Sequence, residues 1–201
     1  MKYTIVSSSP RSQSQSLKIS RFIEQALKKL PGATSWLLDL SGNPLPLWDE
    51  SIWQGAEPWQ KTWEPIKSQL QSSDGFIFVV PEWSGMVPPG LKNLFLLSSA
   101  YEFGHKPALI VAISASRGGS YPVTELRLSS YKNTRLLYLP EHLILREVEK
   151  LFNPGTPEIE DDIYLRTRLD YCLQLLDQYA QALCKVRSSG VIDHKSFPNG
   201  M

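Results

Sequence analysis

The sequence predicts a single α/β domain in which helices cover both faces of a five-stranded parallel sheet. Short strands that are apolar throughout alternate with helices along the chain, a pattern typical of parallel strands buried on both faces. The chain has 201 residues, which is enough for one such domain with a sizeable core and short for two. We therefore expect one three-layer domain.

The first half of the chain contains the first two predicted strands. Lys2–Val6 is a short apolar strand, and the serine-rich loop Ser7–Ser16 follows it. A helix comes next, because apolar residues recur at nearly helical spacing until Pro31-Gly32 ends the pattern. Ser35–Leu40 is the second strand, and the Pro-, Gly- and Trp-rich segment Ser41–Pro58 is predicted to be a long surface connection. The helix residues are Leu17, Ile19, Phe22, Ile23, Ala26, Leu27 and Leu30.

The central strand is predicted at Gly75–Val80, after a helix at Trp59–Leu70 that Pro65 interrupts or starts. All six residues of this strand are apolar or glycine, and Pro81 must end it because proline has no N–H for the strand ladder. The remaining elements are predicted as a helix at Leu91–Tyr101, a strand at Ala108–Ser114, a helix at Pro122–Tyr131, a strand at Arg135–Leu139 and an amphipathic helix at Ile159–Val186.

The five strands fit the flavodoxin-like order 2-1-3-4-5, so the predicted fold is a flavodoxin-like three-layer sandwich. In this order the loops after the first and third strands meet at the carboxyl edge of the sheet, where open α/β sheets bind their ligands. We assign residues 1–187 to this domain and the polar end, residues 188–201, to a flexible tail.

Composition and charge exclude several classes of function. The formal net charge is +1, which predicts neither a nucleic-acid partner nor the acidic face of a small electron carrier. No apolar run approaches the roughly 18 residues that span a bilayer, so we expect no membrane segment. Cys172 and Cys184 have no CxxC spacing, and the chain is expected to be reduced and cytoplasmic. His105, His142 and His194 show no ligand spacing, so no metal is predicted.

The loop Ser7–Ser16 lies between a strand and a helix amino terminus, where free backbone N–H groups favour an anion. Ser9, Ser14 and Ser16 can donate hydroxyl hydrogen bonds, and Arg11 can add a charge-assisted one. A phosphate site is one interpretation, and a simple helix cap in a flexible loop is the other. The chain has neither GxGxxG nor GxxxxGK[ST], which argues against a Rossmann dinucleotide site and against an NTPase.

Two further loops leave the same predicted edge. Pro81–Asn93 (PEWSGMVPPGLKN) is stiffened by three prolines and leads into a helix. Ile113–Gly119 (ISASRGG) ends in Gly118-Gly119, which allows close backbone approach to a flat ligand, while Ser114 and Ser116 offer donors. Taken alone, this third loop is equally explained as a plain strand-to-helix turn. The three loops together predict a ligand site.

These loops resemble two motifs of the NADPH-dependent FMN reductase family, and the resemblance covers roughly residues 1–152. The first family motif resembles G-S-x-R-x-x-S-x-N, with Ser8 at the glycine, Ser9, Arg11 and Ser14 matching, and Ser16 at the asparagine. The second resembles PEYNxSxPGxLKN. The residues that match it are Pro81, Glu82, Gly85, Pro88, Leu91, Lys92 and Asn93.

The resemblance implies that FMN is bound by all three loops. The first loop would hold the phosphate, and the second and third would hold the isoalloxazine ring. The implied cofactor-binding residues are Ser9, Arg11, Ser14, Gln15, Ser16, Pro81, Glu82, Trp83, Ser84, Gly85, Ser114, Ser116, Arg117 and Gly118. Glu82 and Lys92 are expected to help hold the second loop. No catalytic acid, base or nucleophile is implied, because the cofactor carries the chemistry.

The function implied is an FMN-dependent NAD(P)H oxidoreductase that passes hydride to flavin N5. A small-molecule acceptor such as a quinone, an azo compound, a metal oxyanion or free flavin would then be reduced. NADPH and NADH both stay open as donors. The chain departs from the second motif at Trp83, Ser84, Met86 and Pro89. These departures favour the alternative, a flavodoxin-like binding or sensor module with weak or no flavin binding. A flavodoxin-type electron carrier is the third hypothesis.

Two aromatic and apolar clusters bear on assembly. Trp48, Trp53, Trp59 and Trp63 would form either an aromatic lid or packing against the core or a partner subunit. The run Leu94–Leu97 exceeds what one helix face needs, and it would reach a neighbouring subunit. The family resemblance likewise implies a homodimer or a homotetramer.

Overall fold

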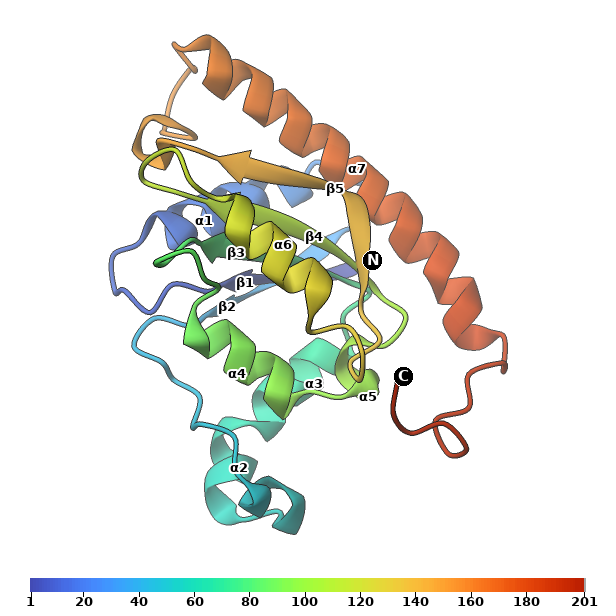
Figure 1. Cartoon of the computed structure of the whole chain (residues 1–201). Coiled ribbons are helices and arrows are strands. Elements are labelled where there is room, and N and C mark those ends of the chain that lie inside the picture. Colours follow the sequence, from blue (N-terminus) through green and yellow to red (C-terminus); the bar gives the residue numbers. More distant parts are fainter. Residues whose placement is uncertain (201) are drawn as a thin grey trace.

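The computed structural model describes residues 1–200 and contains a five-stranded sheet in the order β2-β1-β3-β4-β5 (Figure 1). All four strand pairs are parallel, so the predicted flavodoxin-like fold class and strand order are confirmed. The strands are β1 (Lys2–Ser7), β2 (Thr34–Asp39), β3 (Gly75–Pro81), β4 (Pro107–Ile113) and β5 (Leu137–Leu145).

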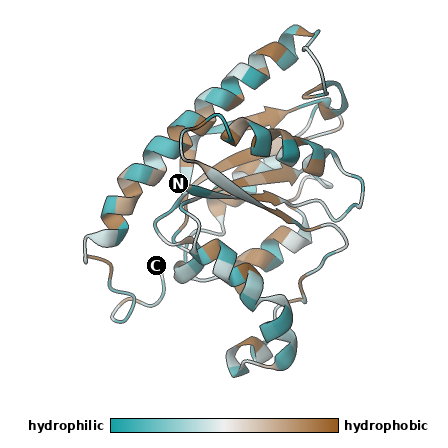
Figure 2. Cartoon of the chain, turned by 180° about the vertical axis from the view of Figure 1, so that it is seen from behind, coloured by the Kyte–Doolittle hydropathy of each residue, from teal (hydrophilic) through white to brown (hydrophobic). Residues whose placement is uncertain are grey.

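Helices cover the sheet on both sides. One side packs against α1 and α7, and the other against α3, α4, α5 and α6. Figure 2 shows mostly hydrophobic strands between helices whose outer surfaces carry hydrophilic residues. The helical segments are α1 (Gln15–Leu27), η1 (Glu50–Gln54), α2 (Glu57–Thr62), α3 (Glu64–Gln71), α4 (Pro89–Leu97), α5 (Ala100–Phe103), α6 (Ser120–Leu128), η2 (Val148–Lys150) and α7 (Glu160–Ser188).

The central strand β3 is buried on both faces, as its apolar sequence predicts. Ile77 and Val79 point into the cluster with α1 and α7, whereas Phe76 and Phe78 point into the opposite cluster. There the ring of Phe76 meets Phe103 edge-on, with the ring centroids 4.6 Å apart. Alternate side chains therefore anchor both helix layers to one strand, and β3 delivers its following loop to a fixed place at the sheet edge.

Two elements differ most from their predicted bounds. The last strand runs to Leu145, beyond the predicted end at Leu139, and Pro140 is tolerated because β5 is an edge strand whose pairing is irregular between Ala108 and Ile110. The predicted helix Leu91–Tyr101 is two helices, because Ser99 caps α5 in a capping box with Glu102.

The tryptophans divide into two pairs. Trp59 and Trp63 are buried in the core, whereas Trp48 and Trp53 are exposed and pack edge to face with ring centroids 5.4 Å apart. The segment with η1 and α2 projects from the rest of the domain (Figure 1). In α4, only Leu96 of the run Leu94–Leu97 is exposed. One helix face thus accounts for most of this run.

The division at residue 187 stays a prediction. Helix α7 ends at Ser188, and the following segment contacts the domain: an Arg135 guanidinium nitrogen lies 2.7 Å from Nδ1 of His194, and a second one donates to the Phe197 carbonyl. Within residues 1–200, no helix is long and apolar enough to cross a membrane. The same residues contain no group of three or more His, Cys, Asp or Glu side chains suited to a metal ion.

Candidate functional site

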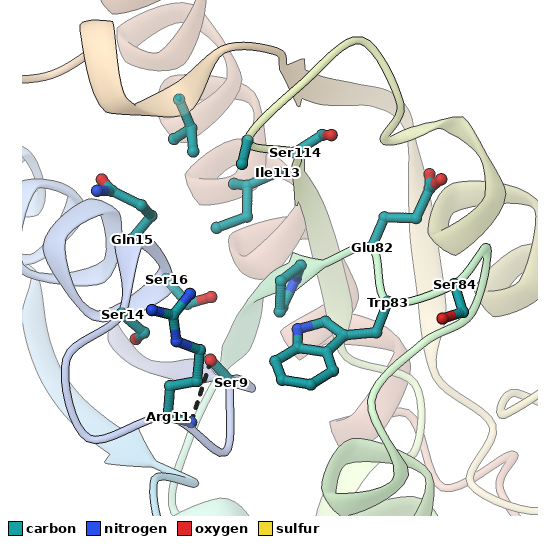
Figure 3. Close-up of a pocket in the computed structure, with 13 residues that line it drawn as sticks. Ser9, Arg11, Ser14, Gln15, Ser16, Glu82, Trp83, Ser84, Ile113 and Ser114 are labelled. Carbon is teal, nitrogen blue, oxygen red and sulfur yellow. Dashed lines mark hydrogen bonds between the residues drawn. The ribbon is translucent and has the colours of Figure 1, made fainter.

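A cavity of about 360 Å³ lies at the carboxyl edge of the sheet, between the loops that follow β1, β3 and β4 (Figure 3). The structure therefore brings the three predicted loops together. Ten of the predicted site residues line the cavity: Ser9, Arg11, Ser14, Gln15, Ser16, Pro81, Glu82, Trp83, Ser84 and Ser114. Gly85, Ser116, Arg117 and Gly118 do not line it, and their predicted contacts with a cofactor stay predictions.

Three further residues line the cavity and were not among the predicted ones: Ile113, Ala115 and Val148. Ile113 and Ala115 belong to the third loop, where they alternate in sequence with Ser114 and Ser116. This alternation with two predicted site residues was the available signal. Val148 follows β5, and its N–H donates to the carbonyl of Ser114 over 3.1 Å. No signal pointed to Val148, because the predicted last strand ended nine residues earlier.

The first loop leads directly into α1. Ser14 caps this helix: its hydroxyl oxygen accepts from the Leu17 N–H at 3.1 Å, which leaves the hydroxyl hydrogen free for a ligand. The Ser9 hydroxyl accepts from the Arg11 N–H at 3.3 Å. Figure 3 shows the Arg11 guanidinium directed toward the start of α1. A positive side chain and the amino end of a 13-residue helix therefore converge on one side of the cavity.

Two polar atoms at the start of α1 have no hydrogen-bond partner among the described residues, 1–200. They are the hydroxyl oxygen of Ser16, a residue only 1% exposed, and Oε1 of Gln15. A buried polar atom without a partner is unfavourable, so both are explained if a ligand supplies the partner. The Ser16 hydroxyl can donate to a phosphate oxygen, and Gln15 Oε1 can accept from a sugar-alcohol hydroxyl. The residues present thus fit the phosphate and ribityl parts of FMN.

The second loop begins with a two-residue turn. Trp83 and Met86 exchange backbone hydrogen bonds of 3.0 and 2.9 Å, and both central residues have positive φ, 50° at Ser84 and 74° at Gly85. Positive φ at both positions is the signature of a type I′ turn, in which glycine is favoured. Gly85 therefore serves the turn, and the turn holds the half-exposed Trp83 indole in the cavity wall.

Glu82 links the second loop to the third. Its carboxylate accepts from the Gly119 N–H at 2.5 Å. A Cβ on Gly118 would lie 2.8 Å from Oε1 of Glu82, and one on Gly119 would lie 2.6 Å from the Ile144 side chain. The glycine pair makes room for the Glu82 carboxylate and the Ile144 side chain, and its predicted close approach to a ligand stays a prediction. Figure 3 shows Glu82 directed toward this third loop.

Lys92 of α4 and Glu125 of α6 form a second link, between the helix that follows the second loop and the helix that follows the third. Their side chains make an ion pair, and the same carboxylate accepts from the Val87 N–H at 2.7 Å. Beyond Ser114, the third loop is tied to the segment after β5, since the Ser116 carbonyl accepts from the Glu147 N–H at 2.9 Å and the Arg117 carbonyl from Arg146 Nε at 2.8 Å. The walls of the cavity are thus joined to one another by contacts between protein groups.

Comparison with known proteins agrees with this geometry. The model of the NADPH-dependent FMN reductase family matches residues 1–149, and the chain belongs to this family. The resemblance inferred from the two loop motifs is thereby confirmed.

Curated relatives include a quinone reductase of Pseudomonas putida, 30% identical over 121 residues, which are 58% of this chain and 62% of the relative. The match thus spans about three fifths of that relative's length. An NADPH azoreductase of a Bacillus species is 23% identical over 146 residues, covering 72% of this chain and 76% of the relative.

Solved structures share the fold. The flavoenzyme NAD(P)H:(acceptor) oxidoreductase FerB of Paracoccus denitrificans superposes with a TM-score of 0.67, at 16% identity, over 90% of this chain and 97% of that one. At this identity the likeness shows the fold alone.

Proposed function

We propose that this protein is an FMN-dependent NAD(P)H oxidoreductase that reduces a quinone, an azo compound, a flavin or a similar small acceptor. The observation that carries the proposal is the pair of unpartnered polar atoms on Ser16 and Gln15, two residues that line the cavity at the amino end of α1. Membership in the NADPH-dependent FMN reductase family, together with relatives described as quinone reductase and NADPH azoreductase, supports it.

The first loop would hold the FMN phosphate. The hydroxyls of Ser9, Ser14 and Ser16 donate hydrogen bonds, and the Arg11 guanidinium neutralises charge next to the positive end of α1. Gln15 would accept from the ribityl chain. Bound FMN would supply the redox chemistry, since it accepts hydride from a nicotinamide at N5 and gives the electrons up to a second substrate.

The second and third loops would enclose the ring. Trp83 offers a flat aromatic face, and the Ser114 hydroxyl, which accepts from the Ser116 N–H at 3.2 Å, keeps its own hydrogen for a ligand. The Glu82 carboxylate is engaged by Gly119 and serves as a positioning group. Proton transfer by a protein side chain is not required in this scheme.

A flavodoxin-like binding or sensor module is the second candidate. The observation that favours it is the bulky Trp83 indole in the wall of the cavity, in place of the tyrosine of the family motif. Tight stoichiometric FMN binding would contradict this candidate.

Assembly and location are further parts of the proposal. We propose a homodimer or a homotetramer, supported by Leu96 of α4 and Leu128 of α6, which are exposed on the same side of the sheet. A cytoplasmic location is supported by Cys172 and Cys184, which are both free thiols.

The test is the visible absorption spectrum of the purified protein, taken after FMN addition and desalting and again after anaerobic NADPH. The proposal predicts retained flavin absorbance that bleaches with NADPH. Loss of all flavin on desalting would favour the binding module, and retained flavin that NADPH and NADH both fail to bleach would contradict the oxidoreductase.

A further inference from the structure

Val148 lines the cavity from outside the three loops, in the segment that follows β5. Its N–H donates to the Ser114 carbonyl at 3.1 Å, so this residue contacts the third loop directly. Its carbonyl accepts from the ammonium nitrogen of Lys18 at 3.0 Å, and Lys18 belongs to α1, the helix that follows the first loop. Val148 therefore joins the third loop to α1.

Lys18 holds more of the segment after β5 than Val148 alone. The same ammonium group donates to the Leu151 carbonyl at 2.8 Å and to Oδ1 of Asn153 at 3.0 Å. The first and last of these three acceptors are 130 and 135 residues from Lys18 in the sequence. The contact thus has no local sequence pattern, and it ties two distant parts of the chain together beside the cavity.

The three hydrogen bonds explain a positive charge at an unfavourable place. The Lys18 N–H bonds the Ser14 carbonyl at 3.2 Å, in the first turn of α1, where the helix dipole disfavours a cation. Burial lowers the pKa of the Lys18 ammonium group, against the opposing effect of the Asp162 and Glu149 carboxylates. An ammonium group has three N–H donors, and the segment after β5 supplies an acceptor for each of them. Unlike Arg11, which lines the cavity, Lys18 thus has no donor left for a phosphate.

We propose that Lys18 is a positioning residue for the ring end of the flavin site and acts through Val148 on the third loop. The inference rests on the proposed function, in which the first loop holds the phosphate and the third loop encloses the ring. Without Lys18, the Val148 carbonyl loses its partner, and the wall next to Ser114 is less firmly held. The phosphate end keeps its geometry, because the first loop forms it. Small displacements of a supporting wall weaken binding at a site.

The test compares FMN with riboflavin, which has the same ring and ribityl chain but no phosphate. Fluorescence titration of the flavin-free protein gives both dissociation constants. Lys18→Met nearly keeps the length of the side chain but removes its charge and its donors, and it should weaken both flavins by the same factor, about tenfold. Arg11→Ala should weaken FMN alone, because its guanidinium serves the phosphate.

Two further variants control for charge and for the loss of a lysine as such. Lys18→Arg keeps the positive charge and N–H donors, so it should bind both flavins more tightly than Lys18→Met does. Lys29 follows α1, pairs with Asp170 at 3.3 Å and does not line the cavity. Lys29→Met should therefore leave both dissociation constants unchanged.

Amide hydrogen exchange of the flavin-free protein separates a positioning role from a general loss of stability. In Lys18→Met the Val148 N–H should exchange about tenfold faster than in the wild type. The Ser114 N–H donates to the Leu145 carbonyl at 2.9 Å, beside the paired strands β4 and β5, and should keep its protection. Equal acceleration at both amides would show a merely structural role and overturn the inference.

The wild type alone tests the function on which the inference rests. Flavin that is lost on desalting, or that NADPH and NADH both fail to bleach, would contradict the proposed function and the inference with it. Where the wild type passes, Lys18→Met that weakens FMN but not riboflavin would show that the lysine acts as a charge on the phosphate. That result would overturn the inference, as would unchanged affinity for both flavins or a wild type that binds no riboflavin.

Discussion

The two edges of the sheet differ in whether the protein supplies hydrogen-bond partners for the buried polar groups there. At the amino edge the buried groups are saturated. Lys106, which is 5% exposed, donates to the carbonyls of Leu70, Gln71 and Glu102 over 3.0, 2.8 and 2.8 Å, and burial lowers the pKa of its ammonium group to about 8. Asp74, at the start of β3, likewise accepts from the Lys2 N–H at 2.9 Å and pairs with Arg187.

At the carboxyl edge some polar groups are engaged within the protein, as Glu82 is, but two buried polar atoms are left open. The Ser16 hydroxyl and Gln15 Oε1 have no partner within residues 1–200, and two successive residues of the second loop have positive φ. The buried polar groups at the amino edge therefore stabilise the fold, whereas the two unpartnered atoms at the carboxyl edge are available to a ligand. Removal of a polar side chain should thus lower the free energy of unfolding at the amino edge and weaken ligand binding at the carboxyl edge.

The largest effect is expected at Lys106. Lys106→Met removes the donor of three buried carbonyl groups, and it should lower the free energy of unfolding by about 3 kcal/mol. Urea unfolding measures this. The matched control is Lys28→Met, because Lys28 is exposed at the end of α1 and bonds only the Gln25 side chain, so its loss should change stability by less than about 0.5 kcal/mol. Equal losses of stability in Lys106→Met and Lys28→Met would contradict the conclusion that the buried polar groups of the amino edge are fully hydrogen-bonded.

Arg11, at the carboxyl edge, should affect ligand binding and not stability. Arg11→Ala should weaken FMN binding by about 2 kcal/mol, as expected for the loss of a hydrogen bond between charged groups, with little change in unfolding. Flavin fluorescence titration gives the affinity. Arg21→Ala serves as the control, since Arg21 is an exposed arginine of α1 that does not line the cavity. An unchanged dissociation constant in Arg11→Ala would show that this guanidinium does not reach the phosphate.

Substitution of Glu82 tests whether its hydrogen bond to Gly119 holds the third loop in place for FMN binding. Glu82→Ala removes the acceptor of the Gly119 N–H, and FMN affinity should fall by about 1.5 kcal/mol because the third loop loses its attachment. Glu82→Gln keeps a carbonyl acceptor and should restore most of the affinity. If the glutamine variant binds FMN as weakly as the alanine variant, the charge of Glu82 matters and the attachment does not.

The smallest effect is expected in the turn of the second loop. Asparagine tolerates positive φ better than serine, so Ser84→Asn should raise the free energy of unfolding by about 0.5 kcal/mol. Gly85→Ala should lower it by about 1 kcal/mol through backbone strain alone, because the nearest side-chain atom to the new Cβ is 3.9 Å away. Thermal unfolding compares the two. A stabilising Gly85→Ala would contradict the turn.

Sequence reasoning located the edge of the site because that edge depends on local patterns. The apolar strand ending at Pro81 and the serines before α1 fix where two loops begin, and the strand order places them side by side. What was missed depends on contacts between distant residues. Glu82 and Gly119 are 37 residues apart, so their hydrogen bond has no local signature.

The predicted end of the last strand at Leu139 was wrong for a related reason. Pro140 looks like a strand terminator in sequence, and only the position of β5 at the sheet edge makes its missing N–H harmless. Val148 was consequently overlooked as a lining residue, because it belongs to the segment that this longer strand delivers to the cavity.

Two serines of α1 give the most direct test that the carboxyl edge is open for FMN. The hydroxyls of Ser16 and Ser20 are both buried, lie one turn of the helix apart and have no partner in the part of the chain that the structure describes, but of the two only Ser16 lines the cavity. The measurement is the FMN dissociation constant of Ser16→Ala and Ser20→Ala, with urea unfolding of each. We predict about tenfold weaker binding, ~1.4 kcal/mol, in Ser16→Ala alone, and unchanged or slightly higher stability in both. Equal FMN affinity in the two variants would contradict the account.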